Sequence, residues 1–479
     1  MKHSAIIFLF VSFVLSGIAS AQDTQRVDVV SGASRVDATS GASRQDVGRN
    51  GKPKYRFMDH FTIGGYGEAV MTRNFYSNNY LRYNTPNKYK GEQYGVFDLP
   101  HVVINMGYVF GRGWSMGMEI EYEHGGTECA MEIEEEEGGE YESEIERGGE
   151  VALEQFWIQK TFNPYVSIRG GMIIVPVGGT NAHHEPNQFF GVYRPEGENT
   201  ILPCTWHEVG LSVWGAWGKK LDWHYNVMFL PGLDSDRFNS KGWIHGGSGS
   251  PYEFKLATAY AGAFRLDNTS VPGLRLSLSG YAGNSFQNTL QKTKDTKYEK
   301  VKGTVYIGSF DFCYDDHNVI VRGSATYGHL EESDKITTWN RAQRKDAPSP
   351  KQPVASDAYA IGIEAGYDFF HFNDKLAQRN QKFYVFARYD IYDSMWKMAA
   401  DMTPLEWCGR QRFAAGINYF PMKQIAVKAE FAYGLLDSKS SVKYNNEPSI
   451  SMGITYCGLF NKAKLDEWRS RRQNRKFNQ

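Results

Sequence analysis

The chain has 479 residues and a net charge of -1, and its mean hydropathy of -0.50 with no later run of about 18 apolar residues excludes a helical membrane protein. Aromatic residues make up 14% of the chain and glycine occurs 49 times, which is typical of many strands with aromatic belts rather than of a soluble enzyme. The five cysteines have no CxxC pairing, so they indicate neither a disulfide framework nor a zinc knuckle.

Residues 1–21 are predicted to be a signal peptide. Lys2 precedes an apolar run that closes with the small residues Ala19, Ser20 and Ala21, which is the pattern of an exported protein with a cleavage site. Residues 22–59 are polar and rich in glycine and serine, so we expect a flexible leader. At the other end, the basic stretch 461–479 is expected to be a solvated periplasmic tail.

Residues 60–460 contain about sixteen segments in which apolar and polar side chains alternate. In LDWHYNVMF, for example, Trp223, Val227 and Phe229 share one face, whereas His224 and Asn226 share the other. The segments are 60–70, 96–110, 114–124, 153–163, 166–178, 206–217, 221–230, 252–266, 273–283, 302–314, 319–329, 358–370, 381–392, 410–420, 425–435 and 448–460. This even number predicts an all-β fold, a transmembrane antiparallel β-barrel of about 16 strands in the outer membrane of a Gram-negative bacterium.

The connections between these segments alternate between short and long. The stretches at 111–113, 163–164, 218–220, 315–318 and 421–423 are short, whereas 124–152, 179–205, 232–251 and 330–357 are long. A barrel in the outer membrane has short periplasmic turns and long extracellular loops, and a soluble sandwich has no reason for this alternation. We expect the loop 179–205 to fold into the lumen as a constriction, because a barrel of ~16 strands otherwise encloses a wide aqueous hole.

Charged side chains fall on the face opposite the aromatic residues. An Arg or Lys on the lipid face at mid-membrane costs ~2–4 kcal/mol, so we expect these charges to line a water-filled lumen. The basic candidates are Arg169, Lys255, Arg275, Arg322, Arg388 and Lys428, and the acidic ones are Glu364, Asp390 and Glu430. They are equally consistent with a selectivity track that contacts solute and with structural ion pairs across the lumen.

The presumed constriction loop carries the triplet His183, His184 and Glu185, followed by Arg194. With Cys204 and His207 nearby, the triplet could ligate zinc. Adjacent side chains in an extended loop point in different directions, and neither HExxH nor another paired spacing is present. The favoured interpretation is therefore a set of polar constriction residues, with no metal or other cofactor.

The glutamate-rich stretch 128–146 would place a negative patch at the mouth of the barrel and repel anions within about a Debye length, ~8–10 Å. Calcium binding or bridging to lipopolysaccharide through divalent ions is an alternative, but the stretch lacks the spacing of a dedicated calcium loop. We expect a solvated, flexible loop.

The stretch GGMIIVPVGG, with NQFFGVYRPEGENTILPCTWHEVGLSVWG after it, resembles the phosphate-selective porin O and P family. The matching positions are Pro176, Gly178, Phe190, Arg194, Pro195, Trp206, Glu208 and Gly210. The resemblance implies a sixteen-stranded, trimeric porin whose pore is lined by basic residues that pass anions. This chain departs from that pattern, because its loop also carries acidic residues and no ladder of arginines, so phosphate selectivity does not follow.

The sequence therefore predicts a porin: a channel for passive diffusion of small hydrophilic or ionic solutes, including anions such as phosphate. Its expected partners are the lipid bilayer, lipopolysaccharide, the solutes and two further copies in a homotrimer, but no nucleic acid. An outer-membrane enzyme is disfavoured, because no GxSxG or other triad motif appears. A plugged barrel that acts through its outer loops in adhesion or ligand binding stays open as the alternative.

Overall fold

The computed structural model describes residues 60–124, 129–135, 141–147, 151–249, 256–288, 297–343, 349–400, 402–437 and 442–460. Its strands are β1 Phe61–Asn74, β2 Tyr94–Asp98, β3 His101–Gly111, β4 Trp114–Glu123, β5 Cys129–Glu135, β6 Tyr141–Arg147, β7 Val151–Asn163, β8 Val166–Ile174, β9 His207–Trp217, β10 Trp223–Pro231, β11 Tyr260–Asn268, β12 Leu274–Asn284, β13 Thr304–Asp316, β14 Val319–Leu330, β15 Asp357–Asp368, β16 Lys382–Lys397, β17 Gly409–Met422, β18 Ile425–Leu436 and β19 Glu447–Leu459.

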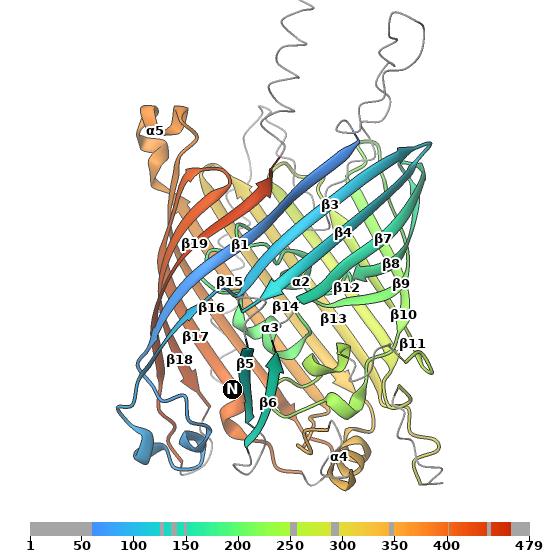
Figure 1. Ribbon diagram of the computed structural model, residues 1–479, viewed down its shortest axis with the longest axis vertical. Helices are drawn as coiled ribbons and strands as arrows, with labels where there is room; N and C mark the ends of the chain where they lie inside the picture. The colour runs from blue at the N-terminus through green and yellow to red at the C-terminus, as the bar shows by residue number, and fades with distance from the viewer. Residues whose placement is uncertain are drawn as a thin grey trace, which may run out of the picture.

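The main sheet closes into a barrel (Figure 1). From β7 to β19 each strand pairs antiparallel with the next one in the sequence, β3 pairs with β4, and β4 pairs with β7. The sheet closes where β19 pairs with β1, from Gly64 opposite Leu459 to Asn74 opposite Ser449. Strands β2 and β3 both pair with β1, one after the other, so they occupy a single position interrupted at Pro100, which has no backbone N–H to donate. The barrel therefore has sixteen strand positions, as the sequence predicts.

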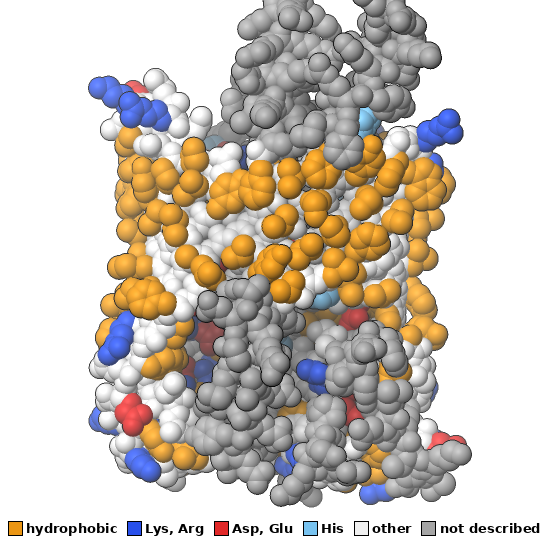
Figure 2. Space-filling model, viewed as in Figure 1, with side chains coloured by type: hydrophobic (Ala, Val, Ile, Leu, Met, Phe, Trp, Pro, Cys, Tyr) orange, Lys and Arg blue, Asp and Glu red, His pale blue; other side chains and the backbone are white. Residues whose placement is uncertain are grey.

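The alternation seen in the sequence separates the two faces of the wall. On β18, Val427 and Phe431 are 45% and 50% exposed on the outside, whereas Lys428 and Glu430 are 1% and 4% exposed on the inside. Figure 2 shows a broad apolar surface on the face of the barrel in view, with charged side chains towards its upper and lower ends. A closed barrel with an apolar exterior satisfies every wall hydrogen bond without water, which is the requirement for crossing a membrane with strands. The fold is thus that of a transmembrane β-barrel.

The α-helices are short and lie in the connections: α2 Gly179–Ala182, α3 Glu196–Ile201, α4 Ser333–Ala342 and α5 Asp374–Gln378. Six 3-10 helices accompany them within the described residues: η3 Tyr80–Tyr83, η4 Pro86–Tyr89, η5 Ser235–Arg237, η6 His245–Ser248, η7 Phe369–Phe372 and η8 Glu406–Cys408. No helix among the described residues is both long enough and apolar enough to span a bilayer.

Three boundaries differ from the sequence-based expectation. The segment predicted as 166–178 ends as a strand at Ile174, because Pro176 cannot donate to the ladder. The segment predicted as 252–266 becomes a strand only at Tyr260. The turn between β15 and β16 is longer than expected, because η7 and α5 are inserted; Asn373 caps α5 by accepting from two of its backbone N–H groups.

The acidic stretch 128–146 was expected to be a flexible loop, and this is wrong for most of it: β5 and β6 form a separate antiparallel hairpin. The sequences CAMEIEE and YESEIER alternate apolar and polar residues with the period of a strand, a signal that the charge run obscures. The predicted signal peptide, leader and basic tail lie outside the described residues, as does Lys255.

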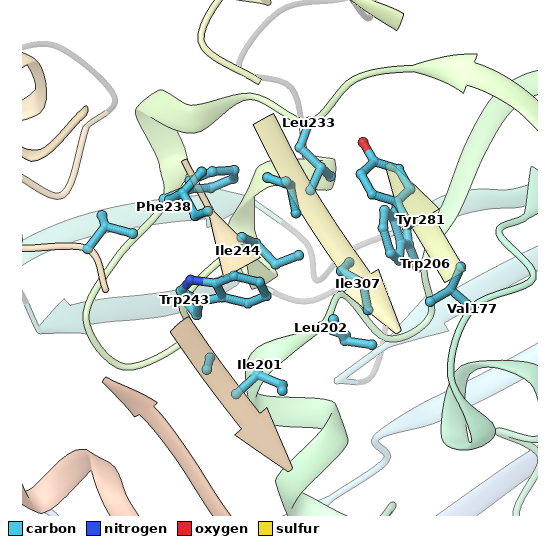
Figure 3. Packing of buried hydrophobic residues seen from close by; sticks show 14 of the residues in the cluster. Val177, Ile201, Leu202, Trp206, Leu233, Phe238, Trp243, Ile244, Tyr281 and Ile307 are labelled. Carbon is cyan, nitrogen blue, oxygen red and sulfur yellow. The ribbon is translucent and has the colours of Figure 1, made fainter. Parts of the chain in front are cut away.

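A hydrophobic core lies between the wall and the long connections (Figure 3). The connections contribute Val177, Ile201, Leu202, Trp206, Leu233, Phe238, Trp243, Ile244, Ile336, Trp339 and Val354, and the wall contributes Met228, Leu230, Tyr281, Ile307 and Tyr392. Burying one large aromatic side chain of this kind contributes roughly 4–6 kcal/mol as an upper estimate. The long connections between β8 and β9, β10 and β11, and β14 and β15 are therefore held by packing.

Candidate functional site: a loop across the barrel lumen

The connection between β8 and β9, residues 175–206, is termed the inner loop here. It leaves the wall after Ile174 and rejoins it at His207. Its helix α2 contacts β13 and β14, and its helix α3 contacts β15 and β16, which are far from β8 and β9 around the barrel. The inner loop therefore crosses the lumen, as the sequence predicts for a constriction (Figure 1).

The inner loop is closed at its base by two of its own side chains. The Glu198 carboxylate accepts hydrogen bonds from the three successive backbone N–H groups of residues 179–181, the shortest at 2.7 Å. The Asn181 side chain donates to the Val175 carbonyl at 2.7 Å and accepts from the Trp206 N–H at 2.6 Å. These contacts join the entry and the exit of the inner loop, so that it behaves as one unit.

Lys428 of β18 holds the far side of the inner loop. Its ammonium group donates to the backbone carbonyls of Pro186, Phe189 and Gly191, the last two at 2.9 Å. It also lies 4.3 Å from the centroid of the Phe189 ring. Lys428 has 1% of its surface exposed, and its ammonium group satisfies three buried carbonyl groups. This residue, predicted to line the pore, therefore anchors the inner loop to the wall.

Two wall carboxylates receive backbone N–H groups from the same part of the inner loop. Glu364 accepts from the Phe190 N–H at 3.2 Å and pairs with Arg322 at 2.9 Å. Glu430 accepts from the Val192 N–H at 3.3 Å. The Phe190 ring stacks against the wall at β16, so carbonyls, amides and an aromatic ring all fix this segment.

Glu196, at the start of α3, is the centre of a partly exposed ionic group. It pairs with Arg412 at 2.8 Å, lies 3.9 Å from Arg410, and accepts a hydrogen bond from the Tyr392 hydroxyl. Burial opposes ionisation of this carboxyl, but Arg412 and Arg410 outweigh it and lower the pKa of Glu196 to about 2. The side chains of Glu196 and Arg412 keep 29% and 18% of their surface exposed.

A second ionic group lies where α2 meets the wall. Asp311 pairs with Arg265 at 2.9 Å and with Arg275 at 3.1 Å. Arg265 also donates to the Gly178 carbonyl at 3.1 Å, and Arg275 donates to His183 Nε2. Charged side chains from the neighbouring strands β11, β12 and β13 thus bind the start of the inner loop through hydrogen bonds.

The described candidates from the sequence all lie on the inner face of the wall or in the inner loop, but they do not form one array. The basic wall residues are Arg169, Arg275, Arg322, Arg388 and Lys428, and the loop residues are His183, His184, Glu185 and Arg194. Arg322 pairs with Glu364 on the adjacent strand, and Arg388 pairs with Asp390 at 2.6 Å within its own strand. The structural-pair alternative accounts for these arginines, although the pairs lie within the wall and not across the lumen.

Arg169 differs from the other arginines, since its guanidinium stacks over the Trp157 ring at 4.1 Å and donates to Gln159 at 2.9 Å. Arg194 donates to the carbonyls of His184 and Cys204. Neither residue makes a carboxylate ion pair among the described contacts.

The triplet at 183–185 is divided among three partners. His183 faces Arg275, His184 faces Glu154 of β7 at 4.0 Å, and the Glu185 carboxylate accepts from Cys457 of β19 at 3.2 Å. The zinc set suggested by the sequence is therefore not assembled by these three neighbours. Glu196 was expected only as one of the acidic residues of the loop, and its arginine partners were not foreseen. Sequence reasoning missed Arg265, Asp311, Arg410 and Arg412, which the period-two pattern of β11, β13 and β17 could have placed inside.

No protein-family model matches the chain. An uncharacterized protein of Aquifex aeolicus (strain VF5) is 26% identical over 383 residues, which cover 79% of this chain and 76% of that protein.

Solved structures that resemble the chain include outer-membrane proteins. The outer membrane channel DcaP of Acinetobacter baumannii is 11% identical with a TM-score of 0.44, covering 83% of this chain and 97% of that one. OmpF of Salmonella typhi, in complex with daunomycin, is 10% identical with a TM-score of 0.47, covering 84% and 99%. A porin is 10% identical with a TM-score of 0.41, covering 83% and 100%.

Proposed function

We propose that the protein is a porin: a narrow, water-filled channel for passive diffusion of small hydrophilic or ionic solutes across the outer membrane. One observation carries this proposal. Inside a sixteen-position barrel, beside a loop that crosses the lumen, the side chains of Glu196, Arg322 and Arg412 keep 29%, 20% and 18% of their surface exposed. Ionic groups on the inner face that retain access to water support a hydrated path past the inner loop.

Anion or phosphate selectivity is not part of this proposal. Three arginines beside the inner loop keep some exposure, and each is paired with a carboxylate: Arg322 with Glu364, and Arg410 and Arg412 with Glu196. Paired charges present little net field to a permeating ion, in contrast to a track of unpaired arginines. We propose weak ion selectivity set by the balance around Glu196, with the constriction formed by residues 183–194 and the wall.

The homotrimer implied by the sequence resemblance, contact with lipopolysaccharide and the absence of catalysis belong to the same proposal. The apolar exterior supports burial in lipid or against further copies. Cross-linking of the protein in its native membrane, followed by mass measurement, tests for three copies.

The test of the channel is single-channel conductance of the refolded full-length protein in a planar bilayer, with a reversal potential under a KCl gradient. Steady conductance steps are expected from the wild type. Glu196→Gln is expected to move the reversal potential towards that of the anion, because Arg412 loses its closer carboxylate partner and keeps only Glu430 at 3.4 Å. Absence of conductance from a barrel that is correctly folded by circular dichroism would overturn the proposal.

One observation favours a second candidate, a barrel that acts through its outer loops in adhesion or ligand binding. The hydrophobic core formed by the long connections fills space inside the barrel, and its members Trp206, Trp243 and Phe238 are fully buried. A folded protein without conductance would support this function.

A further inference from the structure

A cluster of potential metal ligands lies where the inner loop meets β4 and β7. Glu119 of β4, Glu154 of β7 and His184 of the inner loop each offer one ligand atom, and these atoms lie within 4.8 Å of one another. The three residues are 3%, 0% and 2% exposed. One imidazole nitrogen and two carboxylate oxygens from three separate segments thus converge in a dry part of the structure.

Neither carboxylate oxygen of Glu154 makes a hydrogen bond of good geometry among the described residues, although both oxygens are inaccessible to solvent and the Thr205 hydroxyl and Arg194 lie near enough to act on its charge. His184 Nε2 lies 4.0 Å from Glu154 Oε1, beyond hydrogen-bonding distance. Leaving a buried polar group unpaired costs ~1–3 kcal/mol, and more for a charged group. A bound cation or a proton at Glu154 would remove this cost.

His184 is oriented as a ligand. Its Nδ1 lies 2.9 Å from the Asn181 carbonyl oxygen, so Nδ1–H donates there and the Nε2 lone pair faces Glu154. A backbone carbonyl on the second ring nitrogen is the usual way in which proteins fix a metal-binding histidine.

Glu119 is also held in place. Its carboxylate accepts a hydrogen bond from Gln155 and another from Asn105 at 3.3 Å. Both donors are neutral amides, so they orient the carboxylate without cancelling its charge. This arrangement leaves the negative charge of Glu119 available to a cation.

The surroundings carry more buried carboxylates than cations. Glu68 and Glu121 are 5% and 3% exposed on the same part of the inner face as Glu119 and Glu154. Arg194 interacts with Glu121 and Glu154, and Lys428 with Glu68. Four carboxylates thus face two fixed positive charges, an imbalance that one divalent cation would cancel.

We propose that Glu119, Glu154 and His184 form a binding site for one divalent transition-metal cation of the zinc type. Mixed imidazole and carboxylate donors suit Zn²⁺ better than Ca²⁺ or Mg²⁺, which take all-oxygen sites. Tetrahedral zinc with bonds of ~2.0–2.1 Å needs ligand atoms about 3.4 Å apart. The 4.0 Å separation of His184 and Glu154 must therefore shrink by about 0.6 Å, and no pair of ligand atoms must shrink by more than about 1.4 Å, because all lie within 4.8 Å of one another.

The ion would fasten the inner loop to the wall at β4 and β7, in addition to the anchor that Lys428 provides from β18, because two ligands belong to β4 and β7 and the third to the loop. Metal content would thereby control how firmly the inner loop is held in the lumen. The site differs from the set suggested by the sequence, since His184 is the one residue of the triplet that takes part.

The test is the metal content of the full-length protein, refolded after EDTA treatment, incubated with Zn²⁺ and freed of excess ion by gel filtration. Mass spectrometry of the metal should find one more zinc per chain in the wild type than in Glu154→Gln. His183→Ala is the matched control, because it alters the neighbouring histidine outside the site, and it should retain the wild-type content. The comparison also subtracts zinc held elsewhere, for example by the acidic stretch 128–146.

Equal zinc content in the wild type and in Glu154→Gln would overturn the proposal, and a protonated carboxyl at Glu154 would then be the explanation. If Glu154→Gln does not refold, His184→Gln provides the same comparison from the loop side. As a second readout, Co²⁺ should give visible d–d bands in the wild type and in His183→Ala but not in the site variants. None of these measurements depends on conductance.

Discussion

Replacing Lys428 by Met should release the far side of the inner loop. Methionine keeps most of the length of the side chain but cannot donate to the carbonyls of Pro186, Phe189 and Gly191. The perturbation therefore removes three buried charge-assisted hydrogen bonds from one short segment and leaves the strand pairing of β18 unchanged.

The size of the effect follows from two opposing terms. A hydrogen bond to a charged group contributes ~1.5–3 kcal/mol, and three of them are not additive. Removing the ammonium also relieves its own desolvation, but it leaves Glu430 and Glu364 with less positive charge nearby. We expect the closed state of the inner loop to lose about 3 kcal/mol, which corresponds to a roughly 100-fold larger open population.

The assay is chymotrypsin digestion of the refolded protein in detergent, with the cut sites identified by mass spectrometry. Phe189 and Phe190 are 3% and 2% exposed, so cleavage after them requires the inner loop to open. When opening is fast, the cleavage rate follows the open population, and Lys428→Met should be cut there about 100-fold faster than the wild type. Lys423→Met, an exposed position in the turn before β18, is the control. Equal cleavage of Lys428→Met and the wild type would refute the anchoring role of Lys428.

Three further outcomes are expected. Glu196→Gln should make the channel more anion-selective, because one negative charge is removed beside Arg412 and Arg410, which keep only Glu430 and Glu447 as partners. An unchanged reversal potential would contradict the ionic balance proposed for the constriction. Since the pKa of Glu196 is lowered to about 2, its anchoring should be complete above pH ~4.5 and decline as the pH falls towards 2. Cleavage of the wild type by pepsin, a protease that is active in this acid range, should therefore rise as the pH falls from ~4.5 towards 2, and more steeply than in Glu196→Gln. Trp243→Ala should weaken the packing of the long connections against the wall by ~3–5 kcal/mol and lower the thermal midpoint of unfolding, measured on gels. Trp217→Ala, on the exposed outer face, should lower the midpoint less. Equal shifts of the midpoint in the two variants would argue against a core inside the barrel.

The sequence by itself determined the barrel, because the period-two alternation is a local property that each strand carries in its own residues. The pattern around Lys428 and Glu430 placed both inside and Val427 outside, and the structure agrees. The alternation of short and long connections likewise follows from chain order alone. Local signals that were overlooked, such as Asn373 as a helix cap, account for the inserted helix α5.

Only the tertiary structure decided how the interior is organised. Lys428 meets Gly191 across 237 residues of sequence, and no local pattern records such a pair. Closure of the barrel brings the inner loop against β13 to β18 and places Arg322 and Arg388 in ion pairs, one of the two arrangements that the sequence left open. In the closed barrel the side chains of His183 and His184 also have different partners, because His183 contacts Arg275 and His184 faces Glu154. The physical reason is that strand faces depend on neighbours in the chain, whereas the partners of a buried charge depend on which distant segments the closed wall brings within a few ångströms.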